Sequence, residues 1–159
     1  MKPDEFLRML KQKSKEFNRL VLHDLPEIIG VEAQNHFREG FERSNQGFTD
    51  ASLTKWLPRK EKRRVDGSMS SKERTRTSRP VLTGESGKLG DSIQYETSPG
   101  QARVFSDMPY AKAHNEGTSN AGRNRSVVIP ERKFMGDSKV LNEKIETILK
   151  EELNKLFTR

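Results

Sequence analysis

Residues 84–89 carry the most suggestive chemistry in the chain, because their order Gly-Glu-Ser-Gly-Lys-Leu is close to the end of a phosphate-binding loop. In such a loop, backbone amides and a lysine hold the phosphates, and a hydroxyl after the lysine reaches Mg²⁺. The spacing here does not fit. Leu82 stands where the first glycine is required, and Leu89 stands where Ser or Thr is required. The sequence therefore argues against a nucleotide site.

Ser86 and the histidines are the residues that could support hydrolysis or bind metal. A nucleophile elbow needs Gly-x-Ser-x-Gly after a buried strand, but Gly87 follows Ser86 directly and no clear strand precedes it. His23, His36 and His114 lack the i, i+4 spacing that places two ligands on one helix face. The absence of cysteine excludes disulfides and thiol chemistry. We predict no catalytic residue, no metal and no cofactor, and keep hydrolysis as the least favoured alternative.

Clustered positive charge is the second chemical feature. The net charge is +7, and residues 59–79 hold nine basic against three acidic residues. Such a cluster can bind phosphates by releasing counterions, but this one has few aromatic residues and no reading helix or zinc module. We favour contact with an acidic partner protein over DNA contact, with a merely solvated loop as the third alternative. The candidate contact residues are Arg59, Lys60, Lys62, Arg63, Arg64, Lys72, Arg74 and Arg76.

Helical periodicity is clearest near the two ends of the chain. Apolar residues recur at three- and four-residue steps over residues 3–22, and a second pattern starts at Pro26 and is expected to end near Arg43. A third helix is expected after Asp137 or Ser138, either of which can serve as its N-cap. Its apolar face comprises Leu141, Ile145, Ile148, Leu149, Leu153 and Leu156.

The middle of the chain must connect these helices. Residues 44–79 lack periodicity, so we expect a long, mobile basic loop in which Trp56 caps the core. Residues 92–98 and 102–106 alternate as two strands around a Pro-Gly turn, and residues 127–129 form a third, edge strand closed by Pro130. The predicted fold is α+β over a single domain, residues 1–159, with two N-terminal helices, the basic loop, a small antiparallel sheet, and a C-terminal helix packed on the sheet.

Composition restricts where the protein works. Hydrophobic residues make up 31% of the chain and charged residues 33%, so the apolar residues must gather in a few elements to form one core. The N-terminal residues alternate apolar with charged, unlike a signal peptide. The longest apolar runs are only a few residues, far short of the roughly 20 needed to span a bilayer. We expect a soluble protein, made in the cytoplasm, with no membrane partner.

Three short blocks follow one another in a fixed order. Residues 86–93 are Ser-Gly-Lys-Leu-Gly-Asp-Ser-Ile, residues 110–117 are Tyr-Ala-Lys-Ala-His-Asn-Glu-Gly, and residues 129–136 are Ile-Pro-Glu-Arg-Lys-Phe-Met-Gly. Together they resemble the signature of Mu-like phage virion-morphogenesis proteins, and the N-terminal half is similar through Phe37, Gly40, Phe41 and Trp56. One departure is the spacer between Leu82 and Ser86, which is one residue longer than usual. The matching motif residues are Ser86, Gly87, Leu89, Ser92, Ile93, Tyr110, Ala111, His114, Gly117, Pro130, Arg132 and Phe134.

This resemblance implies a function that composition alone does not show. Proteins of this kind finish the phage tail or join it to the head, usually as a ring of identical subunits in contact with other virion proteins. The resemblance places the chain in the host bacterial cytoplasm during assembly and then in the virion. We expect His114, in the second block, to be an oriented loop histidine and no catalyst. The alternative function is that of a small basic DNA-binding protein.

Overall fold

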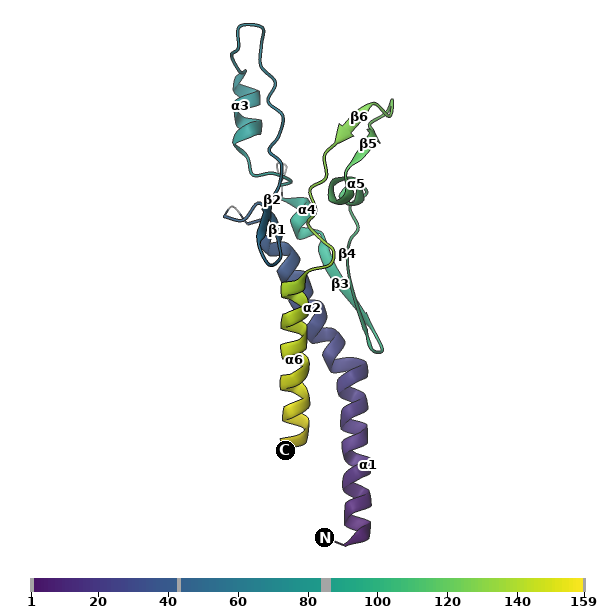
Figure 1. The fold of residues 1–159 in the computed structure, drawn as a ribbon. Coiled ribbons are helices and arrows are strands. Elements are labelled where there is room, and N and C mark those ends of the chain that lie inside the picture. Colours follow the sequence, from purple (N-terminus) through teal and green to yellow (C-terminus); the bar gives the residue numbers. More distant parts are fainter. Residues whose placement is uncertain (1, 43, 84–86, 159) are drawn as a thin grey trace.

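The computed structural model describes residues 2–42, 44–83 and 87–158, and it has the predicted α+β composition (Figure 1). Helices predominate at both ends of the chain, and short strands lie between them. In chain order the elements are α1 (Pro3–Arg19), the π-helical turn η1 (Leu20–Asp24), α2 (Leu25–Glu39), β1 (Gly47–Thr49), β2 (Leu53–Lys55), α3 (Ser71–Ser78), α4 (Lys88–Asp91), β3 (Ile93–Ser98), β4 (Gln101–Ser106), α5 (Ala111–Glu116), β5 (Thr118–Ala121), β6 (Val127–Ile129) and α6 (Lys139–Thr158).

The two N-terminal helices form one rod, because the π-helical turn η1 joins α1 directly to α2. Pro26 lies in the first turn of α2 and has no N–H to donate to the turn before it; there the Leu22 carbonyl accepts the Gly100 amide at 3.1 Å instead. The helix ends at Glu39 with Gly40 as its C-cap. Arg43, near which this helix was expected to end, lies outside the described residues. Helix α1 extends away from the rest of the molecule (Figure 1) and has no buried residue.

Helix α2 packs against the hairpin of β3 and β4. The strands pair in the register Ile93↔Ser106, around the predicted turn at Pro99 and Gly100. Gly30 lets the helix approach closely, since any side chain at this position would collide with the Tyr95 ring. The Arg38 guanidinium donates to the Ile93 carbonyl at 2.7 Å. Ile93 is fully buried beneath the helix, so this strand enters the core where α2 crosses it.

The C-terminal helix α6 begins where the sequence predicted. The Ser138 hydroxyl accepts a hydrogen bond from the Leu141 amide at 3.3 Å, which makes Ser138 the N-cap. The Asp50 carboxylate, from the turn between β1 and β2, accepts the Lys139 amide at 2.7 Å and adds negative charge at the helix N-terminus. The sequence predicted that α6 would pack on the sheet. Instead, α2 packs on the hairpin of β3 and β4, and α6 packs along α2. Only Leu141 of its apolar face is buried.

The sequence predicted one small antiparallel sheet, and this prediction is wrong. Strand β6 pairs with β5, whereas β3 pairs with β4 and β1 with β2, each as a separate two-stranded antiparallel sheet. Residues 44–79 are also more ordered than a loop, because they contain β1, β2 and α3. These elements escaped prediction for a physical reason: the strands have three residues each, and α3 has no apolar stripe. The mobility of this segment stays a prediction.

Aromatic side chains hold the separate elements together in one core. Phe134 is 1% exposed and meets the Phe41 ring edge-to-face at a centroid distance of 5.4 Å. Trp56 is buried against the other side of Phe41, with ring centroids 5.0 Å apart. The Trp56 indole N–H donates to the Lys133 carbonyl at 2.6 Å, so its one polar group is satisfied. The prediction that Trp56 caps the core is confirmed.

Candidate partner-binding site

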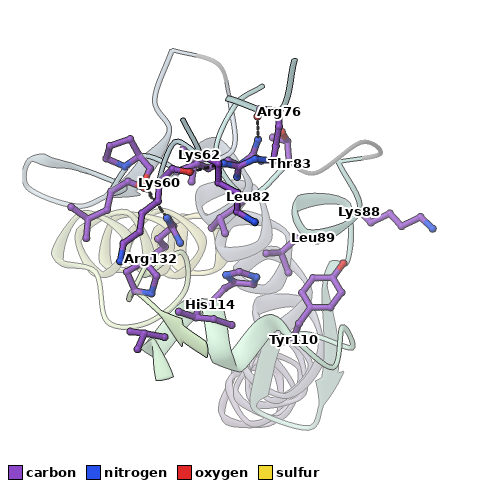
Figure 2. A pocket seen from close by; sticks show the side chains of 17 residues that line it. Lys60, Lys62, Arg76, Leu82, Thr83, Lys88, Leu89, Tyr110, His114 and Arg132 are labelled. Carbon is purple, nitrogen blue, oxygen red and sulfur yellow. Dashed lines mark hydrogen bonds between the residues drawn. The ribbon is translucent and has the colours of Figure 1, made fainter. Parts of the chain in front are cut away.

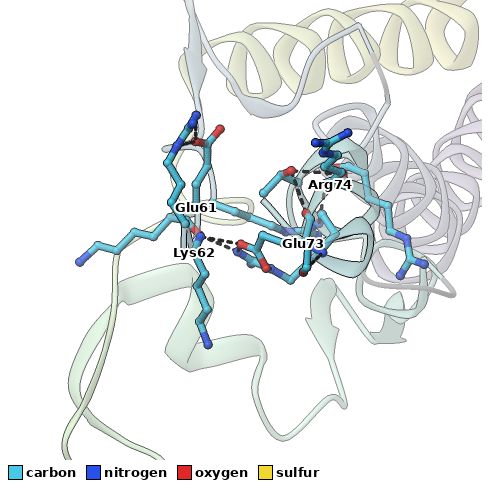
Figure 3. A network of polar contacts seen from close by, with 11 residues as sticks. Glu61, Lys62, Glu73 and Arg74 are labelled. Atoms are coloured by element: carbon cyan, nitrogen blue, oxygen red, sulfur yellow. Dashed lines mark hydrogen bonds and ion pairs between the residues drawn. The ribbon is translucent and has the colours of Figure 1, made fainter. Parts of the chain in front are cut away.

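Residues 57–83 form a projection that we call the basic arm; α3 packs back against the extended chain that precedes it (Figures 1 and 3). Glu73 organises this arm. Its carboxylate accepts the Lys62 amide at 2.7 Å and pairs with the Arg76 guanidinium, and its own amide donates to the Ser70 hydroxyl at 3.2 Å. The hydrogen bond from Arg76, followed by that from Lys62, lowers the pKa of Glu73 to about 2.

Two arginines anchor the base of the arm through backbone carbonyls. The Arg59 guanidinium donates to the carbonyls of Arg76 at 2.6 Å and Pro80 at 2.9 Å. The Arg132 guanidinium donates to the Leu57 carbonyl at 2.9 Å and more weakly to Pro58 at 3.3 Å. Burial, and then the positive charges of Arg76 and Arg79, lower the pKa of Arg59. These bonds fix how the arm leaves the core.

The predicted contact residues therefore divide into two groups. Arg59 and Arg76 are half-buried and bond within the arm, so their guanidiniums hold it together. The other six are exposed on its surface: Lys60, Lys62, Arg63, Arg64, Lys72 and Arg74. Arg63 also pairs with Glu61 at 2.8 Å, but both side chains are exposed and such pairs contribute little stability. Their contact with a partner stays a prediction.

A cavity of about 830 Å³ lies between the basic arm and the segment that contains α5 and β6 (Figure 2). The three sequence blocks converge on it, although residues 94–109 separate the first block from the second and residues 118–128 separate the second from the third. Leu89 comes from the first block, Tyr110 and His114 from the second, and Pro130 and Arg132 from the third. The arm closes the opposite wall. The structure thus brings residues from all three blocks together at one cavity.

The remaining motif residues build the frame around this cavity. Gly87 is the N-cap of α4 and has a φ of 66°, a left-handed conformation that favours glycine. Gly117 is the C-cap of α5 and has a φ of 72°. A side chain at Gly117 would place its Cβ 2.8 Å from the Glu131 amide nitrogen. The Ser92 hydroxyl bonds to that of Ser106 at 2.7 Å. Ile93, Ala111 and Phe134 are buried in the core. Ser86 lies outside the described residues.

His114 is a half-buried member of the cavity wall. Its carbonyl accepts the Arg132 amide at 2.8 Å, and its ring meets the Tyr110 ring edge-to-face at 6.0 Å. Burial, followed by the positive charge of Arg132, lowers the pKa of His114, so the neutral imidazole is favoured. Within residues 2–42, 44–83 and 87–158, no group of three or more His, Asp or Glu side chains is placed to hold a metal ion.

Sequence reasoning missed one residue that positions the site. The Asn115 side-chain oxygen accepts the amides of Phe134 at 2.8 Å and Met135 at 3.0 Å. It therefore ties the end of α5 to the third block and holds Arg132 beside His114. The available signal was its place inside the second block, but an asparagine in a short helix carries no periodicity that would single it out.

A charged arm, a cavity and a helix with no buried residue are the features of this chain that lie outside its core. The model of the phage virion morphogenesis family matches residues 9–154, and the chain belongs to this family. The match covers α2, the basic arm and all three blocks that line the cavity. No curated protein and no solved structure matches the chain. Among the described helices, none is both long enough and apolar enough to cross a membrane.

Proposed function

We propose that the chain is an assembly subunit that acts in tail completion or head–tail joining. It works by self-association into a ring and by contact with neighbouring virion proteins, and it catalyses no reaction. It is made in the host bacterial cytoplasm and then becomes part of the virion. Family membership supports the phage assembly role. The observation that supports self-association is the apolar face of α1, on which no residue is fully buried within the subunit.

Helix α1 has the composition of a helix that packs against a partner. Phe6, Leu10 and Phe17 lie on one face, and they are 44%, 47% and 40% exposed. Helical stability in proteins comes mainly from packing of an apolar face, and none of the 17 residues of α1 is buried within the subunit. A contiguous exposed apolar surface of this kind marks an interaction site. A second copy of the chain offers the same face, so identical subunits can bury it.

The basic arm supplies the second contact. Its six exposed cations repel one another unless solvent or an acidic surface lies opposite. Contact with an acidic surface on a neighbouring subunit or another virion protein removes that repulsion. Because exposed charges are screened by salt, this contact should weaken as ionic strength rises.

Analytical ultracentrifugation of an α1 variant tests self-association. Replacing Phe6, Leu10 and Phe17 with Ser should convert the assembly to monomer, since the face that drives association is lost. Replacing Lys11 and Lys15, which are exposed on the same helix, with Ser is the matched control and should leave the assembly intact. Circular dichroism should show that α2 and α6 remain folded in both proteins. Persistent assembly of the first variant would exclude α1 as the contact.

DNA binding is the second candidate function, and the concentration of positive charge on the arm is the observation that favours it. Phosphate contacts would make the affinity fall steeply with salt. Tight, sequence-independent and salt-sensitive binding of duplex DNA by the isolated protein would favour this function. A stable cyclic oligomer without DNA would favour assembly.

A further inference from the structure

The cavity beside the basic arm has the dimensions and lining of a binding site. Its volume of about 830 Å³ falls in the range of about 300–1,000 Å³ that is typical of ligand pockets. Its wall is largely aliphatic. The arm contributes Leu57, Val81 and Leu82, and the opposite side contributes Leu89, Val128 and Ile129. An apolar side chain of a ligand would therefore exchange water for aliphatic contacts on entering it.

The charge around this cavity is of one sign. Six basic residues line it, and none of its described lining residues is acidic; the basic residues are Arg59, Lys60, Lys62, Arg76, Lys88 and Arg132. Arg76 is compensated by Glu73, but Arg59 and Arg132 bond to carbonyls and to no carboxylate among the described residues. Arg132 is only 8% exposed, so water screens its charge poorly. The cavity therefore favours an anionic ligand.

An open strand edge borders the same cavity. Strand β6 belongs to a two-stranded sheet and pairs with β5 along one edge only. Val127 and Val128 on this strand are 51% and 67% exposed, and Val128 and Ile129 line the cavity. An exposed apolar edge strand can accept an additional strand from another chain through backbone hydrogen bonds.

Together, the aliphatic lining, the uncompensated cations and the open edge select one class of occupant. We propose that an extended acidic segment of a neighbouring virion polypeptide docks here, with its backbone along β6, one large apolar side chain in the cavity, and its carboxylates at Lys60, Lys62 and Lys88. The side chains of Lys60 and Lys62 lie at the arm side of the cavity, and Lys88 lies at its other rim (Figure 2). The identity of the partner as a virion protein rests on the proposed function.

A nucleic acid fits the same lining less well. Sequence-tolerant binding of single strands relies on aromatic side chains on which bases stack. Tyr110 and His114 are the aromatic rings among the described lining residues, and they already pack edge-to-face against each other. The aliphatic wall offers no stacking platform, whereas it suits a Leu, Ile or Met side chain.

Fluorescence anisotropy of the full chain with labelled decapeptides tests this proposal. A peptide of alternating Glu and Leu should bind. A Glu-Ser peptide lacks the apolar side chains and a Lys-Leu peptide lacks the carboxylates, so each should bind at least about tenfold more weakly. The double variant Lys60→Glu, Lys62→Glu should weaken the Glu-Leu peptide by at least about tenfold. The side chains of Lys60 and Lys62 are exposed, so circular dichroism should show that the double variant remains folded.

Two matched controls separate docking from general electrostatics. Arg63→Glu with Arg64→Glu changes the charge of the same arm equally but lies outside the lining, and should change peptide affinity by less than about twofold. Val128→Glu should abolish binding, whereas Val127→Glu, also exposed on β6 but outside the lining, should retain it. Equal weakening by both charge-reversal pairs, or no binding of the Glu-Leu peptide at millimolar concentration, would overturn the proposal.

The remaining outcomes identify a different occupant. Tighter binding of an oligothymidylate than of the Glu-Leu peptide would overturn the proposal in favour of nucleic acid. Dissociation of the self-assembled protein by the peptide would place a second copy in the cavity and overturn the assignment to another virion protein. Peptide binding does not require a ring. A wild-type protein that is monomeric but still binds the Glu-Leu peptide would therefore contradict the proposed self-association and leave the docking proposal standing.

Discussion

The Arg132 guanidinium donates a hydrogen bond to the Leu57 carbonyl at 2.9 Å, across 75 residues of chain. This bond joins the third sequence block to the base of the basic arm, and Arg132 also reaches the Pro58 carbonyl at 3.3 Å. The planar guanidinium can serve both acceptors, which a single ammonium cannot do in the same geometry. Arg132 therefore has a structural role in addition to lining the cavity.

Arg132→Lys should loosen the base of the arm. We expect a loss of about 1–2 kcal/mol, because a partly buried hydrogen bond from a charged donor is removed. Amide exchange should accelerate at Lys62, whose amide donates to the Glu73 carboxylate in the arm, while α2 remains protected. The exposed Arg123, replaced by Lys, is the control and should leave exchange unchanged. Unaltered protection in the Arg132 variant would show that other contacts hold the arm.

The Glu73 carboxylate should titrate far below its usual range. Its pKa is about 2 in the folded protein against an ordinary value of 4.5, so its contribution to the arm is present above pH 4.5 and is lost as pH falls towards about 2. Carbon-detected NMR of the side-chain carboxyl should show this midpoint. Arg76→Gln should raise the midpoint towards 4.5, while Arg74→Gln, on the exposed side of α3, should not.

Phe134 should be essential for the stability of the core. It is 1% exposed and packs against Phe41, so Phe134→Ala should cost about 3–5 kcal/mol of unfolding free energy. Phe157 is 68% exposed near the end of α6, and Phe157→Ala should change it by less than about 0.5 kcal/mol. Urea denaturation at low protein concentration measures both. Similar midpoints for the two variants would contradict the assigned core.

The basic arm should be the first part of the subunit that a protease cuts. We expect trypsin to cleave after Arg63 or Arg64, because both side chains are exposed and the arm buries little apolar surface to offset the entropy of ordering. Mass spectrometry of early fragments locates the cut. First cleavage within α2 or α6 would contradict the expected mobility of residues 44–79.

Arg63→Glu combined with Arg64→Glu should impair particle completion and leave the subunit folded. The two exposed charges contribute little to the core, but their reversal repels an acidic partner surface. Complementation of a phage that lacks the protein, scored by infectious particles, measures the effect. Arg123→Glu with Arg125→Glu makes the same charge change on the turn after β5 and is the control. Normal particle yield from the first pair would exclude Arg63 and Arg64 from the assembly contact.

The elements that local chemistry specifies could be predicted from the amino-acid sequence. The i+4 pattern that includes Ala33 and Phe37 predicted α2, because both side chains must enter one core. The turn at Pro99 and Gly100 set the register of β3 and β4, and Ser138 marked the start of α6. The ordered blocks also indicated the family. Each signal lies within a few neighbouring residues, where spacing and backbone preference are sufficient.

Which faces of the helices are buried, and which distant segments contact one another, follows from the tertiary structure alone. Periodicity predicted the apolar face of α1, but not that the face is left exposed, because burial depends on where other elements pack. Helix α3 has no apolar stripe, and the bonds of Glu73 to Lys62 and Arg76 support it. The cavity lies between segments that Arg132 joins through its bond to the Leu57 carbonyl. Such contacts join residues distant in the chain, so no local pattern encodes them.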